Sequence, residues 1–129
     1  MPPRILIADD SQSVRTGIRR MIEGHDGWEI CGEAKDGHEA MQKTFDLSPD
    51  VVVLDFFMPE TNGIVVAREI AQKCPNTSVI LCSMYLDSQL AELARDAGIA
   101  GILSKSNAGQ IVNCIETVLR GEKFYASSI

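Results

Sequence analysis

Short, mostly apolar runs that each end at a polar side chain constrain the fold of this chain most strongly. The four runs and the polar residues that follow them are Ile5–Ala8 with Asp9 and Asp10, Val51–Leu54 with Asp55, Val79–Cys82 with Ser83, and Gly101–Ser104 with Lys105. Strands that are apolar almost throughout are buried on both faces, as in parallel sheets. The carboxyl ends of parallel strands meet at one edge, where ligands bind. The pattern therefore predicts three carboxylates, a hydroxyl and an ammonium group at one site.

Helical patterns separate the strand-like runs. Val14, Ile18 and Met21, for example, recur at the spacing of one helix face. The predicted strands are Arg4–Ala8, Glu29–Ala34, Val51–Asp55, Ser78–Cys82 and Gly101–Ser104. The predicted helices are Ser13–Gly24, Gly37–Phe45, Gly63–Lys73, Ser88–Ala97 and Ala108–Arg120. This alternation predicts an α/β fold with one doubly wound parallel sheet.

Length and charge restrict the function. A chain of 129 residues, 45% of them hydrophobic, suits a single domain with one core. The formal charge of -6 lacks the positive surface from which nucleic-acid binding usually starts, so we expect no direct binding to nucleic acid. No charged leader precedes a long apolar stretch at the start of the chain, which predicts a cytoplasmic protein without membrane association. The four cysteines form no Cys-x-x-Cys pair, and reduced thiols are expected.

The predicted cluster of polar groups has a definite chemistry. Carboxylates held close together repel, so they must keep a proton or bind a cation, and oxygen ligands favour Mg2+, with Mn2+ as a second candidate. Ser83 and Lys105 would face the equatorial oxygens of a phosphoryl group. Asp55 is then a candidate nucleophile, because a carboxylate can attack phosphorus and form an acyl phosphate.

These residues resemble a known family over essentially the whole chain. The matching features are Asp9-Asp10 after the first strand, Asp55-Phe56-Phe57-Met58-Pro59 with Asn62-Gly63, Ser83 after the fourth strand and Lys105 after the fifth. In this order and at this spacing they resemble a response regulator receiver domain. The resemblance implies a five-stranded parallel sheet of the doubly wound, flavodoxin-like type, with strand order 2-1-3-4-5 in a three-layer αβα arrangement.

The resemblance also implies roles and partners. The implied roles are phosphoacceptor for Asp55, phosphate binding for Lys105, a switch hydroxyl for Ser83, and a metal site made by Asp9, Asp10, Asp55 and the backbone carbonyl of Phe57. The donor would be a histidine kinase or a phosphotransfer protein. The domain would not be an enzyme beyond catalysing its own phosphorylation and dephosphorylation.

A narrower resemblance is to receivers of LuxR-type transcription factors. It rests on Val14-Arg15-x-Gly17-Ile18-Arg19-Arg20, on Lys105-Ser106-Asn107-Ala108 and on the segment Val118–Tyr125. A helix-turn-helix output domain follows the receiver in that subgroup. We interpret residues 1–129 as one receiver domain and expect that an output domain is absent from this chain by removal, the alternative being that none was present. The resemblance also implies that phosphorylation favours either a homodimer or the release of an output domain.

Three departures from the family pattern involve four positions. Ile102 stands where an aromatic switch residue is usual, which puts the coupled movement of a ring in doubt. Ser106 stands where proline is common; a cis bond would cost about 2.5–4 kcal/mol here, so we expect a trans peptide and an altered loop. Phe57 and Tyr85 lie where the family controls access of water, and their rings predict slow self-dephosphorylation.

Other classes of function remain open. In a phosphorylation-independent interaction module, partner binding would carry the signal, and Ile102 favours this reading mildly. A phosphatase or phosphotransferase with an aspartyl intermediate would need an acid for its second step, and no Asp-x-Asp follows the third strand. A nucleotide-binding fold is weaker still, because neither Gly-x-Gly-x-x-Gly nor a Walker loop follows the first strand.

Overall fold

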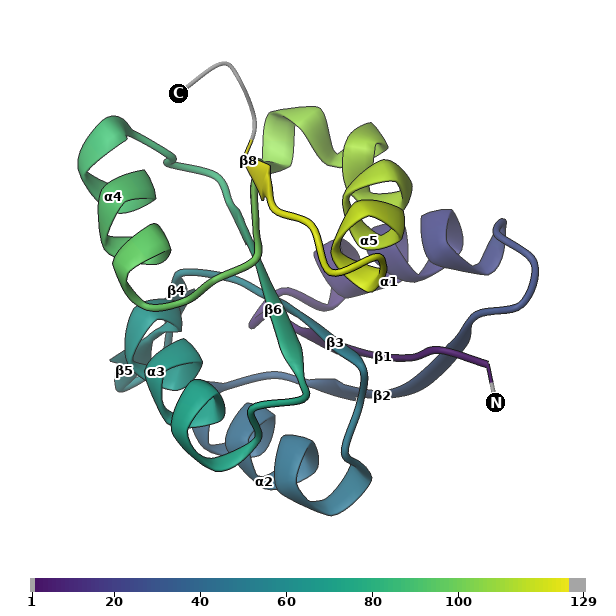
Figure 1. Cartoon of the computed structure of the whole chain (residues 1–129), viewed down its shortest axis with the longest axis horizontal. Coiled ribbons are helices and arrows are strands. Elements are labelled where there is room, and N and C mark those ends of the chain that lie inside the picture. The colour runs from purple at the N-terminus through teal and green to yellow at the C-terminus, as the bar shows by residue number, and fades with distance from the viewer. Residues whose placement is uncertain (1, 126–129) are drawn as a thin grey trace.

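The computed structural model describes residues 2–125 and shows a three-layer αβα arrangement, with a central sheet and helices on both of its faces (Figure 1). The strands are β1 Arg4–Ala8, β2 Glu29–Ala34, β3 Val51–Leu54, β4 Phe57–Met58, β5 Thr61–Asn62, β6 Ser78–Ser83, β7 Gly101–Ser104 and β8 Phe124–Tyr125. The helices are α1 Gln12–Glu23, α2 Gly37–Leu47, α3 Gly63–Lys73, α4 Ser88–Asp96 and α5 Ile111–Leu119. A 3-10 helix, Lys105–Gln110, leads into α5.

The alternation of side chains along the strands divides the core into two layers. Leu6 and Ala8 of β1 pack with α2, α3 and α4, whereas Ile5 and Ile7 of the same strand pack with α1 and α5. All four side chains are buried, as the apolar run predicted. Because successive strand residues point to opposite faces, each strand contributes to both layers. The sheet is therefore covered on both sides, and its polar groups are confined to its ends.

The topology confirms the predicted fold class. The main sheet has the order β2-β1-β3-β6-β7-β8 and all its pairs are parallel, so its first five strands reproduce the predicted order. The prediction of five strands is corrected by β8, a two-residue strand that pairs with β7. A short antiparallel hairpin of β4 and β5, outside the main sheet, was also not predicted. The last predicted helix begins at Ile111 rather than Ala108, because the preceding turn is a 3-10 helix.

Short polar side chains fix where four of the helices begin. Ser11, Asp36, Asn62 and Asp87 each accept a hydrogen bond from a backbone N–H in the first turn of α1, α2, α3 and α4. These contacts satisfy donors that lack a partner inside the helix, and each typically contributes about 1 kcal/mol. Ser11 and Asp36 lie within three residues of the ends of β1 and β2, and Asn62 is the last residue of β5, so these caps set the direction in which the chain leaves the strands.

Two glycines offer a test of how tightly the layers are packed. A Cβ at Gly101 would lie 2.7 Å from Cys114 Sγ and 2.9 Å from Ile80 Cγ1, whereas a Cβ at Gly17 in α1 lies more than 4 Å from the described atoms outside its own helix. We expect Gly101→Ala to lower the free energy of unfolding by about 1–3 kcal/mol through overpacking. Gly17→Ala should raise it by about 0.4–1 kcal/mol, because it restricts the unfolded chain. Urea denaturation measures both, and equal effects would contradict this account of the packing.

Candidate functional site

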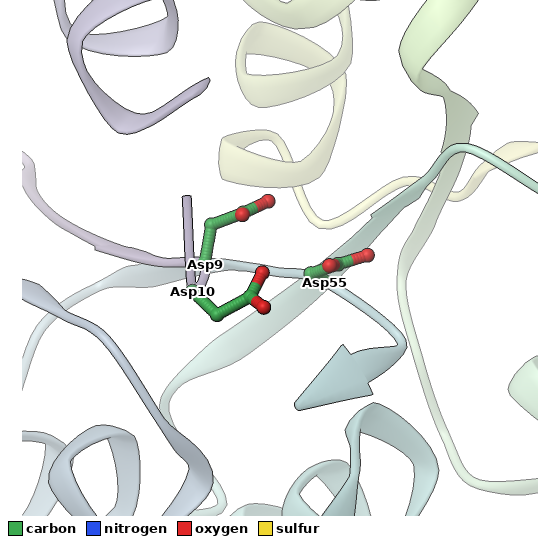
Figure 2. A group of neighbouring side chains, drawn as sticks. All are labelled: Asp9, Asp10 and Asp55. Carbon is green, nitrogen blue, oxygen red and sulfur yellow. The ribbon is translucent and has the colours of Figure 1, made fainter. Parts of the chain in front are cut away.

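Three carboxylates gather at the carboxyl edge of the sheet, from two neighbouring strands. Asp9 and Asp10 follow β1, Asp55 follows β3, and one oxygen from each lies within 4.8 Å of the others (Figure 2). Asp9 and Asp55 are buried, with 2% and 4% of their surfaces exposed, whereas Asp10 is exposed. The sheet topology thus brings together residues that are far apart in the sequence, as the strand-end pattern predicted.

Lys105 extends into this cluster from the end of β7. Its Nζ lies 2.7 Å from Asp9 Oδ2 and 3.3 Å from Asp55 Oδ2, and only 14% of its side chain is exposed. Charge-assisted contacts of this length are among the stronger hydrogen bonds in proteins. One ammonium group therefore bridges the two buried carboxylates. The formal charge of Lys105 and the three carboxylates together is still negative.

Two buried oxygen atoms at the site lack a partner. Within residues 2–125, no hydrogen-bond partner reaches Asp55 Oδ1 or Ser83 Oγ, although both atoms are buried. A buried polar group without a partner is costly, and a bound water, an ion or a ligand would satisfy these two atoms. Carboxylate oxygens are ligands that Mg2+ prefers, and a hydroxyl donates well to a phosphoryl oxygen. The donor set therefore fits a hard divalent cation beside a phosphoryl group.

The site shifts the acidity of its own groups. Burial, with the negative charge of Asp9 added to it, raises the pKa of Asp55 above its ordinary value, although Lys105 opposes this. Burial alone would lower the pKa of Lys105, but the hydrogen bond to Asp9 and the charge of Asp55 outweigh burial and raise it. Lys105 is therefore firmly cationic. The ionised form of Asp55 is less favoured than that of an exposed aspartate, and added positive charge would favour it.

Backbone contacts hold the loop that carries the acidic pair. Asp9 Oδ1 accepts a hydrogen bond of 2.9 Å from the Ser11 N–H, and the Asp9 N–H donates to the Ala34 carbonyl at 3.0 Å. The Asp9 carbonyl accepts a bond of 2.7 Å from Arg15, whose Nε also binds Glu33. The sequence analysis assigned no role to Arg15 or Glu33. No local pattern reveals the pair, because 18 residues separate them in the sequence.

Gly63 allows the chain to pass close behind the phosphoacceptor candidate. A Cβ at this position would lie 2.5 Å from the Asp55 carbonyl oxygen and 3.1 Å from Phe56 Cα. The Gly63 N–H also donates to the Phe56 carbonyl at 2.8 Å. Only a residue without a side chain permits this approach. The Asn62-Gly63 pair that contributed to the family resemblance therefore has a packing role beside Asp55.

Two exposed aromatic rings lie next to each other on the loops near the site. Phe57 is 52% exposed and Tyr85 is 70% exposed. Their ring centroids are 6.0 Å apart in an edge-to-face arrangement, and Phe56 packs edge-on against Phe57 at 4.9 Å. Edge-to-face pairs of this kind attract each other. The rings that the sequence placed two residues after Asp55 and after Ser83 are thus neighbours in space.

The two other departures from the family pattern are also visible. Ile102 is fully buried in the α2–α3–α4 layer, and its register partner on β8 is Tyr125. The peptide between Lys105 and Ser106 is trans, as expected, and both residues belong to the 3-10 helix. The cysteines Cys31, Cys74, Cys82 and Cys114 are all free thiols, also as expected. Burial raises the pKa of Cys82 and of Cys114 to about 12, so both are poor nucleophiles.

Comparison with known proteins assigns the family. The model of the response regulator receiver domain matches residues 5–116, and the chain belongs to this family. Such domains act in two-component signalling and are not classical enzymes. The narrower LuxR-type resemblance is confirmed as well. A LuxR-family two-component response regulator from Aurantimonas sp. SI85-9A1 is 34% identical in its crystal structure, with a TM-score of 0.92, covering 98% of this chain and 91% of that one.

Curated relatives agree with this assignment. Response regulator UvrY of Escherichia coli (strain K12) is 35% identical over 97% of this chain and 58% of its own length. Response regulator GacA of Pseudomonas viridiflava is 32% identical over 98% of this chain and 59% of its own length. The chain therefore spans less than two thirds of these relatives. Within residues 2–125, no helix has the length and apolar character needed to cross a bilayer.

The raised pKa of Asp55 predicts how charge at the site affects stability. With EDTA present, Asp55→Asn should raise the free energy of unfolding at pH 7, because the ionised carboxylate opposes folding. The gain should vanish as the pH falls below the ordinary carboxyl pKa of about 4, where both states hold the proton. Urea denaturation at a series of pH values measures this.

Mg2+ at 100 times its dissociation constant should raise the free energy of unfolding of the wild type by about 2.7 kcal/mol, and that of Asp55→Asn by less.

Asp26→Asn is the control for the loss of one acidic charge, because Asp26 lies in an exposed turn. Its effect should stay within about 0.5 kcal/mol at every pH. An Asp55→Asn protein that is less stable than the wild type at all pH values would contradict the role assigned to buried charge repulsion.

Proposed function

We propose that this receiver domain accepts a phosphoryl group on Asp55 from a phosphohistidine donor. The observation that carries the proposal is the buried Asp55 carboxylate, which has one unpartnered oxygen and an ammonium group 3.3 Å from the other. The phosphorus–nitrogen bond of the donor breaks, an oxygen–phosphorus bond to Asp55 forms, and the product is an acyl phosphate. Histidine is the leaving group and takes up a proton.

The residues around Asp55 would support this transfer in different ways. Asp9, Asp10 and Asp55, together with the Phe57 carbonyl, would hold Mg2+, which supplies positive charge to the phosphoryl oxygens. Lys105 already lies between Asp9 and Asp55 and would move its ammonium group onto the phosphoryl oxygens. Mn2+ suits the same oxygen ligands. The firm cationic state of Lys105 keeps this charge available at neutral pH.

Ser83 would couple the acyl phosphate to a change of conformation. Its buried hydroxyl has no partner within residues 2–125. Ser83 is the last residue of β6, so a bond to a phosphoryl oxygen would displace the loop that follows it and α4. The acyl phosphate carries nearly two negative charges where the ionised carboxylate carried one. A shift of the population from 1:99 to 99:1 requires about 5.5 kcal/mol, and two or three charge-assisted contacts would supply much of it. Ile102 stands where the family usually has an aromatic residue, so we propose that the Ser83 hydroxyl alone couples phosphorylation to the change of conformation.

The partners follow from the family. A histidine kinase or a phosphotransfer protein in the cytoplasm would be the donor, and the switched state would control a homodimer or a transcriptional output domain. The similarity to a LuxR-family regulator and to relatives that extend well beyond the matched region supports the transcriptional output. The isolated receiver domain of RcsB from Salmonella enterica serovar Typhimurium, solved with the phosphomimetic BeF3-, is 26% identical with a TM-score of 0.92 over 99% of this chain and 96% of that one.

A phosphorylation-independent interaction module is the second candidate. Ile102 favours it, because the usual aromatic residue is missing from that position. The burial of Asp9 and Asp55 opposes it, because two buried carboxylates reduce stability. A module that acted only through surface contacts would be more stable with uncharged residues at these positions. We therefore prefer the phosphorylated receiver.

Acetyl phosphate labelling tests the proposal directly. Incubation with acetyl phosphate and Mg2+ should add the mass of one phosphoryl group to the intact protein, because the phosphorus–oxygen bond of the donor breaks, acetate leaves and Asp55 is phosphorylated. Intact-protein mass spectrometry measures the adduct. Asp55→Asn and a sample with EDTA should both show none. Continued absence of an adduct in the wild type, also with a second small phosphodonor, would favour the interaction module.

The exposed aromatic pair predicts the lifetime of the acyl phosphate. Phe57→Asn should shorten it, because a polar side chain beside Asp55 replaces a ring that limits the access of water. Decay of the labelled protein, followed after removal of the phosphodonor, measures the lifetime. Phe45→Asn is a control, since Phe45 is also a partly exposed ring but lies on α2. An unchanged lifetime in Phe57→Asn would contradict shielding by this ring.

A further inference from the structure

Arg15 connects a neighbouring strand to the loop that carries the acidic pair. It lies on α1, its side chain is only 14% exposed, and its guanidinium donates in two directions. Nε donates to Glu33 Oε1 at 2.9 Å, and Nη1 donates to the Asp9 carbonyl oxygen at 2.7 Å. A planar guanidinium can hold two acceptors in a fixed relative direction, which a flexible ammonium group cannot. The position of the Asp9 carbonyl is therefore tied to that of Glu33.

Glu33 itself is held in place. Its second carboxylate oxygen accepts a bond of 2.8 Å from Arg19, and its backbone carbonyl accepts one from Lys43 of α2. Burial would raise the pKa of Glu33, but the hydrogen bonds from Arg19 and Arg15 outweigh burial and lower it. The carboxylate is thus ionised at neutral pH and anchored from α1. It offers Arg15 a fixed point on β2.

The Asp9 carbonyl is half of the peptide group that leads into Asp10. The orientation of this peptide fixes the position of the Asp10 Cα and hence the position of its side chain. Asp10 is the one exposed member of the acidic cluster, and its neighbour Asp9 is already fixed by Ser11 and Lys105. Arg15 is the side chain that binds the shared peptide from outside the loop.

We propose that Arg15 is a positioning residue for the divalent cation site, which it serves by orienting the Asp9–Asp10 peptide through its paired contacts with Asp9 and Glu33. The inference rests on the proposed function, because it assumes that the acidic cluster binds Mg2+. Arg15 does not itself contact the cation or the phosphoryl group. Its effect is on the affinity for Mg2+.

Charge and positioning predict opposite results when Arg15 is removed. A cation near three carboxylates opposes the binding of Mg2+, so loss of its charge alone should strengthen binding. Loss of positioning should weaken it, and residues that orient metal ligands typically change affinity by about 10–100-fold. The direction of the change therefore distinguishes a positioning role from a purely electrostatic one.

Arg19 provides a matched control. It lies one turn further along α1 and binds the same carboxylate of Glu33, but its other contact is with Glu23 and not with the acidic loop. Arg19→Met and Arg15→Met therefore remove the same charge and one contact with Glu33 each. Only Arg15→Met also releases the Asp9 carbonyl.

Titration calorimetry with Mg2+ alone tests the proposal on the whole chain. We expect the dissociation constant to rise at least about tenfold in Arg15→Met and by a clearly smaller factor in Arg19→Met, where Arg15 still binds both Glu33 and the Asp9 carbonyl. Arg15→Lys keeps the positive charge but loses the planar guanidinium that holds two acceptors at once, so this variant should also bind Mg2+ more weakly. Labelling with acetyl phosphate should return to the wild-type extent in the Arg15 variants when Mg2+ is raised to saturation.

The outcomes separate this inference from the proposed function. A wild type that binds no Mg2+ and takes up no phosphoryl group would overturn both. A wild type that binds Mg2+ while Arg15→Met and Arg15→Lys bind it as well or better would overturn the positioning role alone. If Arg15→Met fails to fold by circular dichroism, Arg15→Lys decides the question. Equal weakening in the Arg19→Met control would also overturn the specific role of Arg15.

Discussion

Electrostatic repulsion among three carboxylates at one sheet edge is the constraint on which this site depends. Asp9 and Asp55 are buried beside each other, and Lys105 is the single ammonium group that bridges them. Such an arrangement lowers stability unless a cation or a proton joins it. The two apolar layers must hold the charged groups together against their repulsion. Under the proposed function, binding energy from Mg2+ and from phosphorylation would be available to change the structure.

Most of the fold and the core of the site could be predicted, because both depend on pattern. The apolar runs fix the first five strands of the sheet and hence the strand ends at which Asp9, Asp55 and Lys105 meet. The shorter elements could not be predicted, since a two-residue strand such as β8 has no periodicity. The polar segment Lys105–Gln110 likewise gives no apolar repeat from which to recognise a 3-10 turn.

The residues that position the site were harder to predict from the sequence than the groups proposed to react. Arg15 and Glu33 meet only after α1 has packed against β2, and their charges look in the sequence like ordinary surface charges. The same holds for Gly63, whose close approach to the Asp55 carbonyl follows from the path of the hairpin β4–β5. The side chains proposed to carry the chemistry lie at predictable strand ends. The contacts that orient them depend on tertiary packing.

The short strand β8 has a consequence for how two copies of this domain can meet. It pairs in parallel with Gly101 and Ile102 of β7, the Phe124 N–H donates to the Ala100 carbonyl, and the Tyr125 hydroxyl donates to the Ile99 carbonyl. The backbone groups along this part of β7 are therefore already occupied by the chain itself. A strand from a second molecule therefore cannot pair with Gly101 and Ile102 of β7 unless β8 is first displaced, and β8 itself becomes the edge of the sheet.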